Sequence, residues 1–237
     1  MNLANIIIPL LDLTSLNETD TETTIKQLSL RAKTPKGSVA AVCVYSQFIK
    51  TVAKILPDNN IKIATVANFP EGSVDLDDTL ITIDEAMSDG ANEIDVVVPY
   101  QAYLKGDKNL VGSFIRNCKE ACHKGILFKT ILETGALVNT ENIYNLSRLA
   151  IENGADFIKT STGKISIGAT PEAATAMLKA IKDSGRLVGF KASGGIRTVE
   201  QAMEYINLAK NIMGEAWISP AHFRIGASTL LDKILEL

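Results

Sequence analysis

Two lysines interrupt apolar segments whose pattern is typical of buried β-strands. Lys159 lies in the segment Asp156–Thr160, and Lys191 ends the segment Leu187–Lys191. Parallel strands buried on both faces are nearly continuous apolar runs, and lysine is rarely fully buried without a partner. A single strand-end lysine can simply extend its ammonium into solvent. Because two lysines end consecutive strands and small polar residues follow both, we favour a shared chemical role.

The chemistry that such a pair supports is nucleophilic attack on a carbonyl. Neighbouring strands lie about 4.8 Å apart, so Lys159 and Lys191 come close if both point inward. Burial and a second ammonium both disfavour the charged form, which would leave one lysine neutral near pH 7. A neutral amine forms a Schiff base with an aldehyde. The spacing alone does not say which lysine is the nucleophile.

An acidic residue interrupts a third strand segment, Glu93–Val98. Asp95 lies at its centre. If its side chain points into the same interior, it would keep one lysine protonated and relay protons during the reaction. The alternative is a buried carboxylate that only forms a structural ion pair. Lys129 and Glu133 interrupt the segment Leu127–Glu133 in the same way.

Glycines and hydroxyl groups follow three of the expected strands. The candidate residues are Gly163 and Lys164 within Thr160–Lys164, Gly194 and Gly195 after Ser193, and Ser228 within Gly226–Thr229. Free backbone NH groups, hydroxyls and a helix N-terminus together form an anion site. Each segment alone is weak evidence, because a Gly-Gly pair more often marks a turn. Three such segments at one edge favour a phosphate site.

Strand-like and helix-like segments alternate along the whole chain. Strands are expected at Val39–Tyr45, Ile61–Ala67, Glu93–Val98, Leu127–Glu133, Asp156–Thr160, Leu187–Lys191, Ala216–Ile218 and Phe223–Gly226. Helices are expected at Thr21–Lys33, Gln47–Leu56, Leu76–Asp89, Asn109–Lys124, Thr140–Asn153, Pro171–Ser184 and Val199–Met213.

This alternation predicts an α/β fold, a (β/α)8 TIM barrel in one domain over residues 1–237. The first 38 or so residues would precede the first strand as an N-terminal helical extension that closes the barrel bottom. In such barrels the C-terminal ends of the strands carry the catalytic groups. A doubly wound open sheet is the alternative, although no Gly-X-Gly-X-X-Gly motif follows any strand.

Composition excludes several classes of function. The 237 residues include 24 Lys and Arg, 27 Asp and Glu, and a net charge of −3, so we expect no nucleic-acid partner. No apolar run is long enough for a membrane span, and no basic residue before Lys26 marks a secretory leader. Three cysteines indicate reduced thiols in the cytoplasm. With only two histidines, we expect no metal and no other cofactor.

The residues around Lys159 resemble a family signature. Phe157–Lys164 is similar to the signature of the deoxyribose-phosphate aldolase family. Other stretches resemble that family in the same order along the chain: Leu11–Thr14, Asn68–Pro70, Glu93–Tyr100, Glu133–Gly135, Val188–Gly195 and Arg224–Leu231. The similarity covers nearly the whole chain.

The resemblance implies a metal-independent class I aldolase. Its reaction is the reversible cleavage of 2-deoxy-D-ribose 5-phosphate to D-glyceraldehyde 3-phosphate and acetaldehyde. By position, Lys159 matches the Schiff-base lysine, Lys191 the second lysine and Asp95 the acid–base aspartate. Asp12 matches a substrate-pocket position. The phosphate-contacting positions match Gly163, Lys164, Gly194, Gly195 and Ser228. A homodimer is also implied.

Two departures from the family and three alternatives remain. Ala192 replaces a common proline, and the chain ends at Leu237, whereas many relatives continue into a tail ending in tyrosine. We therefore expect a less rigid phosphate loop and a differently arranged proton relay.

The alternatives are a Schiff-base aldolase for another aldehyde pair and a non-catalytic sugar-phosphate-binding barrel, with a purely structural barrel a third.

Overall fold

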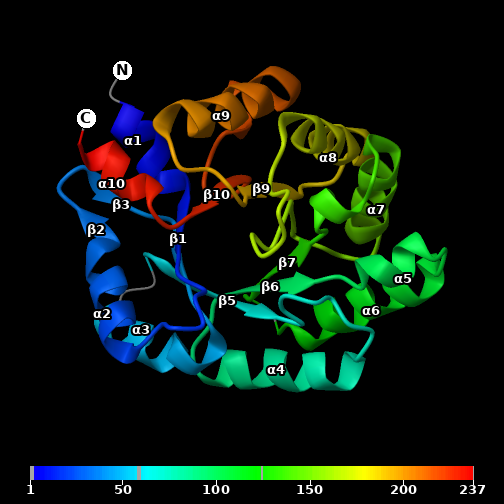
Figure 1. Ribbon diagram of the computed structural model, residues 1–237, viewed down its shortest axis with the longest axis horizontal. Helices are drawn as coiled ribbons and strands as arrows, with labels where there is room; N and C mark the ends of the chain where they lie inside the picture. The colour runs from blue at the N-terminus through cyan, green and yellow to red at the C-terminus, as the bar shows by residue number, and fades with distance from the viewer. Residues whose placement is uncertain (1–2, 58–59, 124, 237) are drawn as a thin grey trace.

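Eight parallel strands close into a barrel in the computed structural model, which describes residues 3–57, 60–123 and 125–236 (Figure 1). The barrel strands are β1 (Leu11–Thr14), β4 (Ala41–Cys43), β5 (Lys62–Ala67), β6 (Glu93–Val97), β7 (Leu127–Ile131), β8 (Phe157–Lys159), β9 (Gly189–Ser193) and β10 (Phe223–Ala227). Because β1 pairs with both β4 and β10, the sheet has no edge within the barrel. This confirms the (β/α)8 prediction and excludes the open doubly wound sheet.

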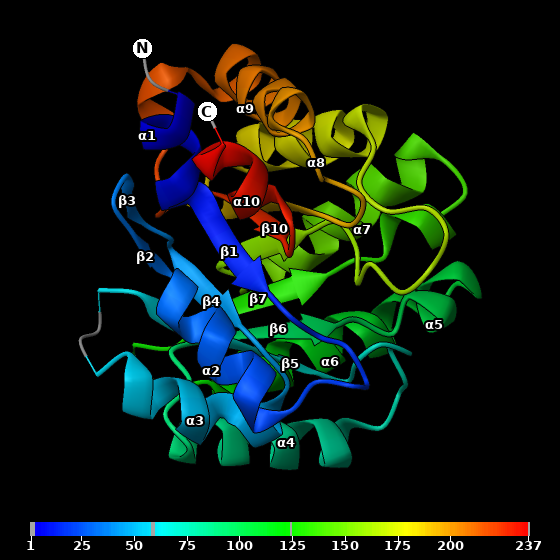
Figure 2. The same ribbon diagram turned by 60° about the vertical axis from the view of Figure 1, so that its left-hand side comes forward.

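Helices surround the barrel on the outside, as two views show (Figures 1 and 2). They are α1 (Leu3–Ile7), α2 (Glu22–Arg31), α3 (Ile49–Ile55), α4 (Leu76–Ser88), α5 (Tyr100–Leu104), α6 (Lys108–Ala121), α7 (Thr140–Glu152), α8 (Pro171–Ser184), α9 (Val199–Met213) and α10 (Leu230–Leu235). Short 3-10 turns are η1 (Ile8–Leu10), η2 (Ser46–Phe48), η3 (Thr134–Ala136) and η4 (Glu215–Trp217). Strands β2 (Lys33–Thr34) and β3 (Gly37–Ser38) form a separate antiparallel pair.

The sequence predicts several helix ends correctly. Helices α8 and α9 begin and end at the expected residues. The Thr170 hydroxyl accepts a hydrogen bond from the backbone NH of Ala173 (3.1 Å), and Pro171 occupies the first turn of α8. A hydroxyl acceptor at the N-cap satisfies an otherwise unpaired NH group, and the fixed φ of proline suits the first turn. These helix-end signals depend only on residues that are neighbours in the sequence.

Two sequence predictions at the barrel are wrong. Ala216–Ile218 is not a strand, because η4 occupies Glu215–Trp217. The missing eighth strand is β1, which lies within the segment expected to be a helical extension. That extension therefore shrinks to α1 and η1, over residues 3–10. β1 has only four residues, contains Asp12 and begins two positions after Pro9, so no continuous apolar run marks it as a barrel strand.

The strand register directs an unusual set of side chains into the barrel. Lys159 pairs with Lys191, and Lys191 with Arg224, so these three side chains share one face of the sheet. Asp95 pairs with Lys129 on the neighbouring strands β6 and β7. All five are buried. Barrel interiors are ordinarily filled with branched apolar side chains. This barrel contains a buried cluster of charges instead.

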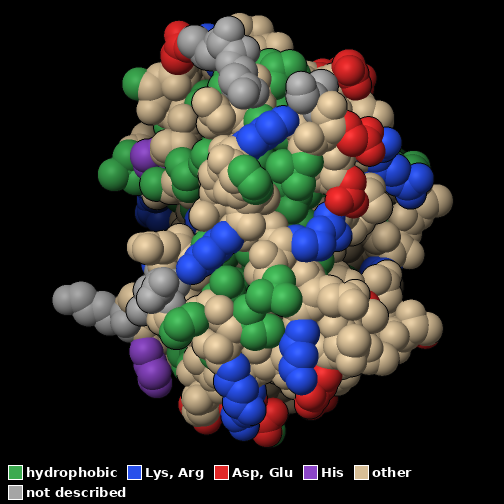
Figure 3. Space-filling view, turned by 90° about the vertical axis from the view of Figure 1, so that its left-hand side faces the viewer, with side chains coloured by type: hydrophobic (Ala, Val, Ile, Leu, Met, Phe, Trp, Pro, Cys, Tyr) green, Lys and Arg blue, Asp and Glu red, His purple; other side chains and the backbone are tan. Residues whose placement is uncertain are grey.

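The outer surface differs from the interior. On the face shown in Figure 3, Lys and Arg side chains are interspersed with apolar and acidic ones. No helix within the described part of the chain is both long and apolar enough to cross a membrane.

Gly189 makes room for an aromatic ring next to the charged cluster. A Cβ at this position would lie 2.3 Å from the ring of Phe157, and the guanidinium carbon of Arg224 lies over the same ring, 5.8 Å from its centroid. We expect Gly189→Ala to lower the free energy of unfolding by about 1–3 kcal/mol, because the ring has to move within a packed barrel. Urea unfolding measures this. In the background of Phe157→Leu the loss should shrink, and an equal loss there would contradict the steric explanation.

Candidate active site

Three of the residues singled out from the sequence meet inside the barrel. One carboxylate oxygen of Asp95, Oδ2, accepts hydrogen bonds from Lys159 Nζ (2.9 Å) and Lys191 Nζ (2.8 Å). Its other oxygen, Oδ1, accepts from Lys129 Nζ (2.7 Å). The side chain of Lys159 is 3% exposed, and those of Asp95, Lys129 and Lys191 are 0% exposed. One carboxylate thus faces three basic groups away from water.

Asp12 lies on the other side of Lys191. Its Oδ2 forms an ion pair with Lys191 Nζ (2.5 Å), and its Oδ1 accepts a hydrogen bond from Arg224 Nη1 (2.7 Å). Asp12 is fully buried and is not among the residues that line the cavity described below. The structure therefore places it as a partner of Lys191 instead of a wall of the pocket.

The two lysines differ in the number of carboxylates that they contact. Burial lowers the pKa of Lys159, and Lys191 lowers it further against the attraction of Asp95. Burial alone would also lower the pKa of Lys191, but Asp12 and Asp95 together raise it above its ordinary value. Burial raises the pKa of Asp95, but Lys129, Lys159 and Lys191 together hold it well below its usual range. Lys159 is consequently the amine that loses its proton most readily.

A cavity of about 310 Å³ opens above Lys159 at the C-terminal ends of the strands. Besides Lys159, its lining includes all five residues expected to hold phosphate: Gly163, Lys164, Gly194, Gly195 and Ser228. The structure thus brings Lys159 and the glycine-rich loops to one cavity. Sequence reasoning missed Arg197, which also lines the cavity, although a basic residue two positions after a Gly-Gly pair is a usable signal.

Close backbone contact shapes the glycine-rich rim. Gly194 has a positive φ of 90°, and a Cβ at this position would lie 2.9 Å from the Cα of Gly168. The backbone NH of Ala169 donates to the carbonyl oxygens of Ser193 (3.1 Å) and Gly194 (3.0 Å). Only glycine fits such a conformation and approach without strain. The loops after β8 and β9 are therefore joined backbone to backbone.

A buried glutamate holds the loop after β8. Glu133 follows β7 in a left-handed conformation, with a φ of 52°. Its carboxylate accepts hydrogen bonds from the backbone NH (3.3 Å) and the hydroxyl of Thr162. The Thr162 hydroxyl in turn accepts from the backbone NH of Lys164 (3.0 Å), and Lys164 Nζ donates to the carbonyl oxygen of Leu16 (2.5 Å). Glu133 thus positions the loop that carries Lys164.

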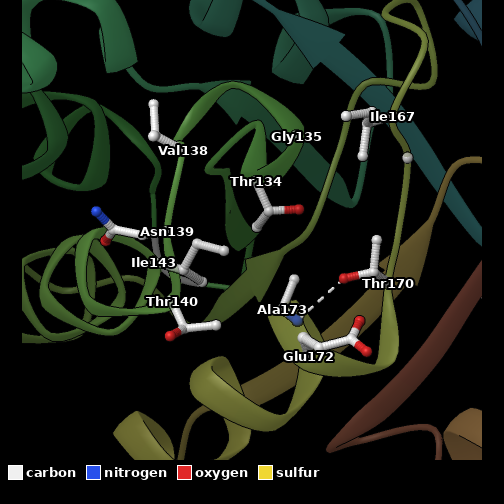
Figure 4. Close-up of a pocket in the computed structure, with 11 residues that line it drawn as sticks. Thr134, Gly135, Val138, Asn139, Thr140, Ile143, Ile167, Thr170, Glu172 and Ala173 are labelled. Carbon is white, nitrogen blue, oxygen red and sulfur yellow. Dashed lines mark hydrogen bonds between the residues drawn. The ribbon is translucent and has the colours of Figure 1, made fainter.

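A second cavity of about 200 Å³ lies between η3 and the loop before α8 (Figure 4). Val138, Ile143 and Ile167 contribute apolar walls, and Glu172 is the one charged residue among its described lining. It contains none of the lysines discussed above. Its chemistry therefore differs from that of the cavity above Lys159, which we treat as the candidate active site. Among the described residues, no group of three or more His, Cys, Asp or Glu side chains is placed to hold a metal ion.

Comparison with known proteins places this geometry in a family. The model of the DeoC/LacD family aldolases matches residues 6–235. The chain belongs to the DeoC/LacD aldolase family. It is 46% identical over 235 residues to a deoxyribose-phosphate aldolase of Agrobacterium fabrum, an alignment that covers 99% of this chain and 91% of the relative.

Solved structures share the fold over the whole chain. A Coccidioides immitis protein assigned to the deoxyribose-phosphate aldolases is 28% identical, with a TM-score of 0.86 over 100% of this chain and 86% of its own. A tetrameric deoxyribose-phosphate aldolase from Aeropyrum pernix is 24% identical, with a TM-score of 0.79 over 98% of this chain and 91% of its own. The family resemblance expected from the sequence is confirmed.

Different charge environments of the two lysines predict opposite effects on stability. We expect Lys191→Met to lower the free energy of unfolding by about 3–5 kcal/mol, because it removes one of the two buried cations that contact Asp12 and one of the three that contact Asp95. Lys159→Met should leave the free energy of unfolding unchanged or raise it. A basic group whose folded pKa lies below its unfolded pKa costs stability at neutral pH, and the substitution removes that cost. Urea unfolding at pH 7 measures both variants, and an equal loss in the two would contradict this reading.

Proposed function

We propose that this chain is a deoxyribose-phosphate aldolase, which cleaves 2-deoxy-D-ribose 5-phosphate reversibly to D-glyceraldehyde 3-phosphate and acetaldehyde. The observation that carries the proposal is the position of Lys159, an amine with a lowered pKa that lines the same cavity as the glycine-rich loops. Membership of an aldolase family and 46% identity to a curated relative of this activity support it.

Lys159 acts as the nucleophile in this proposal. Its neutral amine attacks C1 of the open-chain sugar, and loss of water gives an iminium ion. The lower pKa and the position at the cavity favour Lys159 over Lys191, whose ammonium is bound between Asp12 and Asp95 and does not line the cavity. In its charged form Lys191 stabilises the reacting groups and does not attack the carbonyl.

Bond cleavage follows from the iminium ion, which accepts an electron pair. A water molecule held by Asp95 and Lys191 takes the proton of the C3 hydroxyl, and the electrons of the O–H bond form the new aldehyde. The C2–C3 bond breaks, its electrons form an enamine, and glyceraldehyde 3-phosphate leaves. Protonation of the enamine at C2 and hydrolysis of the imine release acetaldehyde and restore Lys159. Asp95 relays the proton without retaining it, because its pKa is held well below the usual range by its cationic partners despite burial.

The glycine-rich rim binds the phosphate at the far end of the substrate. The backbone NH groups of Gly194 and Gly195, the ammonium of Lys164 and the hydroxyl of Ser228 are the donors we assign to it. Contacts to a remote, non-reacting phosphate orient C1 against Lys159. Asp12 contributes indirectly in this proposal, as the second anion that keeps Lys191 charged.

We also propose a homodimer located in the cytoplasm. The cytoplasmic location is supported by the three cysteines, Cys43, Cys118 and Cys122, which are buried and free. The dimer rests on the family resemblance alone, and the Aeropyrum pernix relative is a tetramer.

Trapping the Schiff base tests the nucleophile and the reaction class together. We expect borohydride reduction in the presence of acetaldehyde to leave a two-carbon adduct on Lys159, located by peptide mass mapping. Lys159→Leu should lower turnover of deoxyribose phosphate by at least about 10³-fold while the fold is retained, because the covalent intermediate cannot form.

The other outcomes of this experiment distinguish the alternatives. An adduct on Lys191 would keep the reaction class and reverse the two lysines. An adduct on Lys159 without turnover of deoxyribose phosphate would favour another aldehyde pair. No adduct on either lysine, with sugar phosphate still bound, would favour a non-catalytic binding barrel.

Loss of a phosphate donor should affect substrates according to whether they carry phosphate. We expect Lys164→Met to raise KM for 2-deoxyribose 5-phosphate by roughly 10–100-fold, the value of one charge-assisted hydrogen bond. The kcat/KM for unphosphorylated 2-deoxyribose should change less than threefold or so, because that sugar makes no contact with the ammonium. Steady-state kinetics with both sugars measures this. Equal losses for the two sugars would show that Lys164 has another role.

A further inference from the structure

Six buried charged side chains form a closed circuit of ion pairs inside the barrel. The contacts in order are Asp95 Oδ1 to Lys129 Nζ (2.7 Å), Lys129 Nζ to Glu93 Oε2 (2.6 Å), Glu93 Oε1 to Arg224 Nη2 (2.9 Å), Arg224 Nη1 to Asp12 Oδ1 (2.7 Å), Asp12 Oδ2 to Lys191 Nζ (2.5 Å), and Lys191 Nζ to Asp95 Oδ2 (2.8 Å). We call these six residues the charge ring. Acids and bases alternate around it, three of each, so the ring is neutral.

Lys159 is attached to the charge ring from outside. Its contact is Asp95 Oδ2, an oxygen that Lys191 already shares. Because the ring is neutral without it, a protonated Lys159 adds a positive charge that the ring itself does not balance. A buried charge is costly unless a partner compensates it. The same carboxylate cannot compensate Lys129, Lys191 and Lys159 fully at once.

Four titratable groups on other elements face Lys159: Asp95 on β6, Lys191 on β9, Cys43 on β4 and Glu133 after β7. Burial raises the pKa of the Cys43 thiol, which therefore stays neutral. Burial raises the pKa of Glu133 despite hydrogen bonds from Thr162, so its carboxylate form is a weaker partner for Lys159 than Asp95. The balance around Lys159 thus depends on the charge ring.

We propose that Lys129, Glu93 and Arg224 are positioning residues that complete the charge ring and thereby make Lys159 the amine that gives up its proton. The inference rests on the proposed function, because it concerns the reactive form of the Schiff-base lysine. Lys129 and Arg224 each bridge two carboxylates, so they keep Asp95 and Asp12 ionised from the side opposite Lys191. Two ionised carboxylates then keep Lys191 as an ammonium.

The charge ring predicts the direction in which each substitution shifts the titration of Lys159, whereas a purely structural role predicts no such direction. Removing the charge of Lys129 leaves the ring with a net charge of −1, which favours a protonated Lys159. Removing the charge of Glu93 leaves the ring with a net charge of +1, which disfavours it. The two substitutions therefore shift the titration of Lys159 in opposite directions. If these residues only supported the fold, both substitutions would simply lower activity at every pH.

The experiment measures the rate of reductive trapping of acetaldehyde on Lys159 with cyanoborohydride between pH 5 and pH 10, by peptide mass mapping. Relative to the native chain, we expect the midpoint of the acid limb to move up by about one pH unit in Lys129→Met and down by about one unit in Glu93→Gln, a roughly tenfold change in rate on that limb. The double variant Lys129→Met/Glu93→Gln, whose ring is again neutral, should return the midpoint close to the native value.

Controls separate charge from folding. Lys50→Met and Glu152→Gln remove the same charges from surface ion pairs and should leave the midpoint unchanged. Circular dichroism monitors the fold, and if Lys129→Met does not fold, Arg224→Gln removes a positive charge at another point of the ring with the same expected sign. Midpoints that move together, or do not move, would overturn the inference. A native chain that forms no adduct on Lys159 would overturn the proposed function, and the inference with it.

Discussion

The cost of burying charge inside the barrel governs the arrangement of this protein. Four basic and three acidic side chains among the described residues point into a space that apolar residues ordinarily fill: Lys129, Lys159, Lys191, Arg224, Asp12, Glu93 and Asp95. Removing an ion from water costs several kcal/mol, and attraction to a well-placed partner offsets that cost only when the geometry is good. In the charge ring each acid contacts two bases and each base contacts two acids, so six of these seven side chains have well-placed partners. Lys159 is the seventh.

Reactivity at Lys159 follows from this imbalance. Its ammonium form is the one that the surroundings compensate least, since Asp95 already serves Lys129 and Lys191. Lys159 also lines the cavity, whereas the ring members are not among its lining residues. In the proposed function, a carbonyl compound that enters the cavity meets Lys159 with a charged network of ion pairs behind it. The network needs little rearrangement when the imine forms, which is the advantage of preorganised charges in a site of low dielectric constant.

The loops at the cavity rim obey a different constraint, which is steric. Gly194 and Gly168 approach so closely that neither position has room for a side chain. Their contact joins the loops after β8 and β9, and Glu133 ties the loop after β8 to the end of β7 through Thr162. The segments that follow β7, β8 and β9 therefore contact one another at the rim of the cavity. A phosphate bound there would be fixed relative to Lys159, since the same strands carry the reactive lysine and its partner Lys191.

The sequence by itself determined the features that depend on neighbouring residues. Alternating strand and helix patterns predict the barrel, and Thr170 and Pro171 predict the start of α8. The lysines in two expected strands indicate amine chemistry, although Lys191 lies at the middle of β9 and not at its end. Only the tertiary structure decided which lysine is uncompensated and that β1 closes the barrel. Asp12 and Arg224 are 212 positions apart in the chain, and Asp95 and Lys191 are 96 apart. Barrel closure and strand register bring them together, and no local pattern encodes either, because a four-residue strand with an aspartate in it becomes recognisable only when the strands on both sides of it are in place.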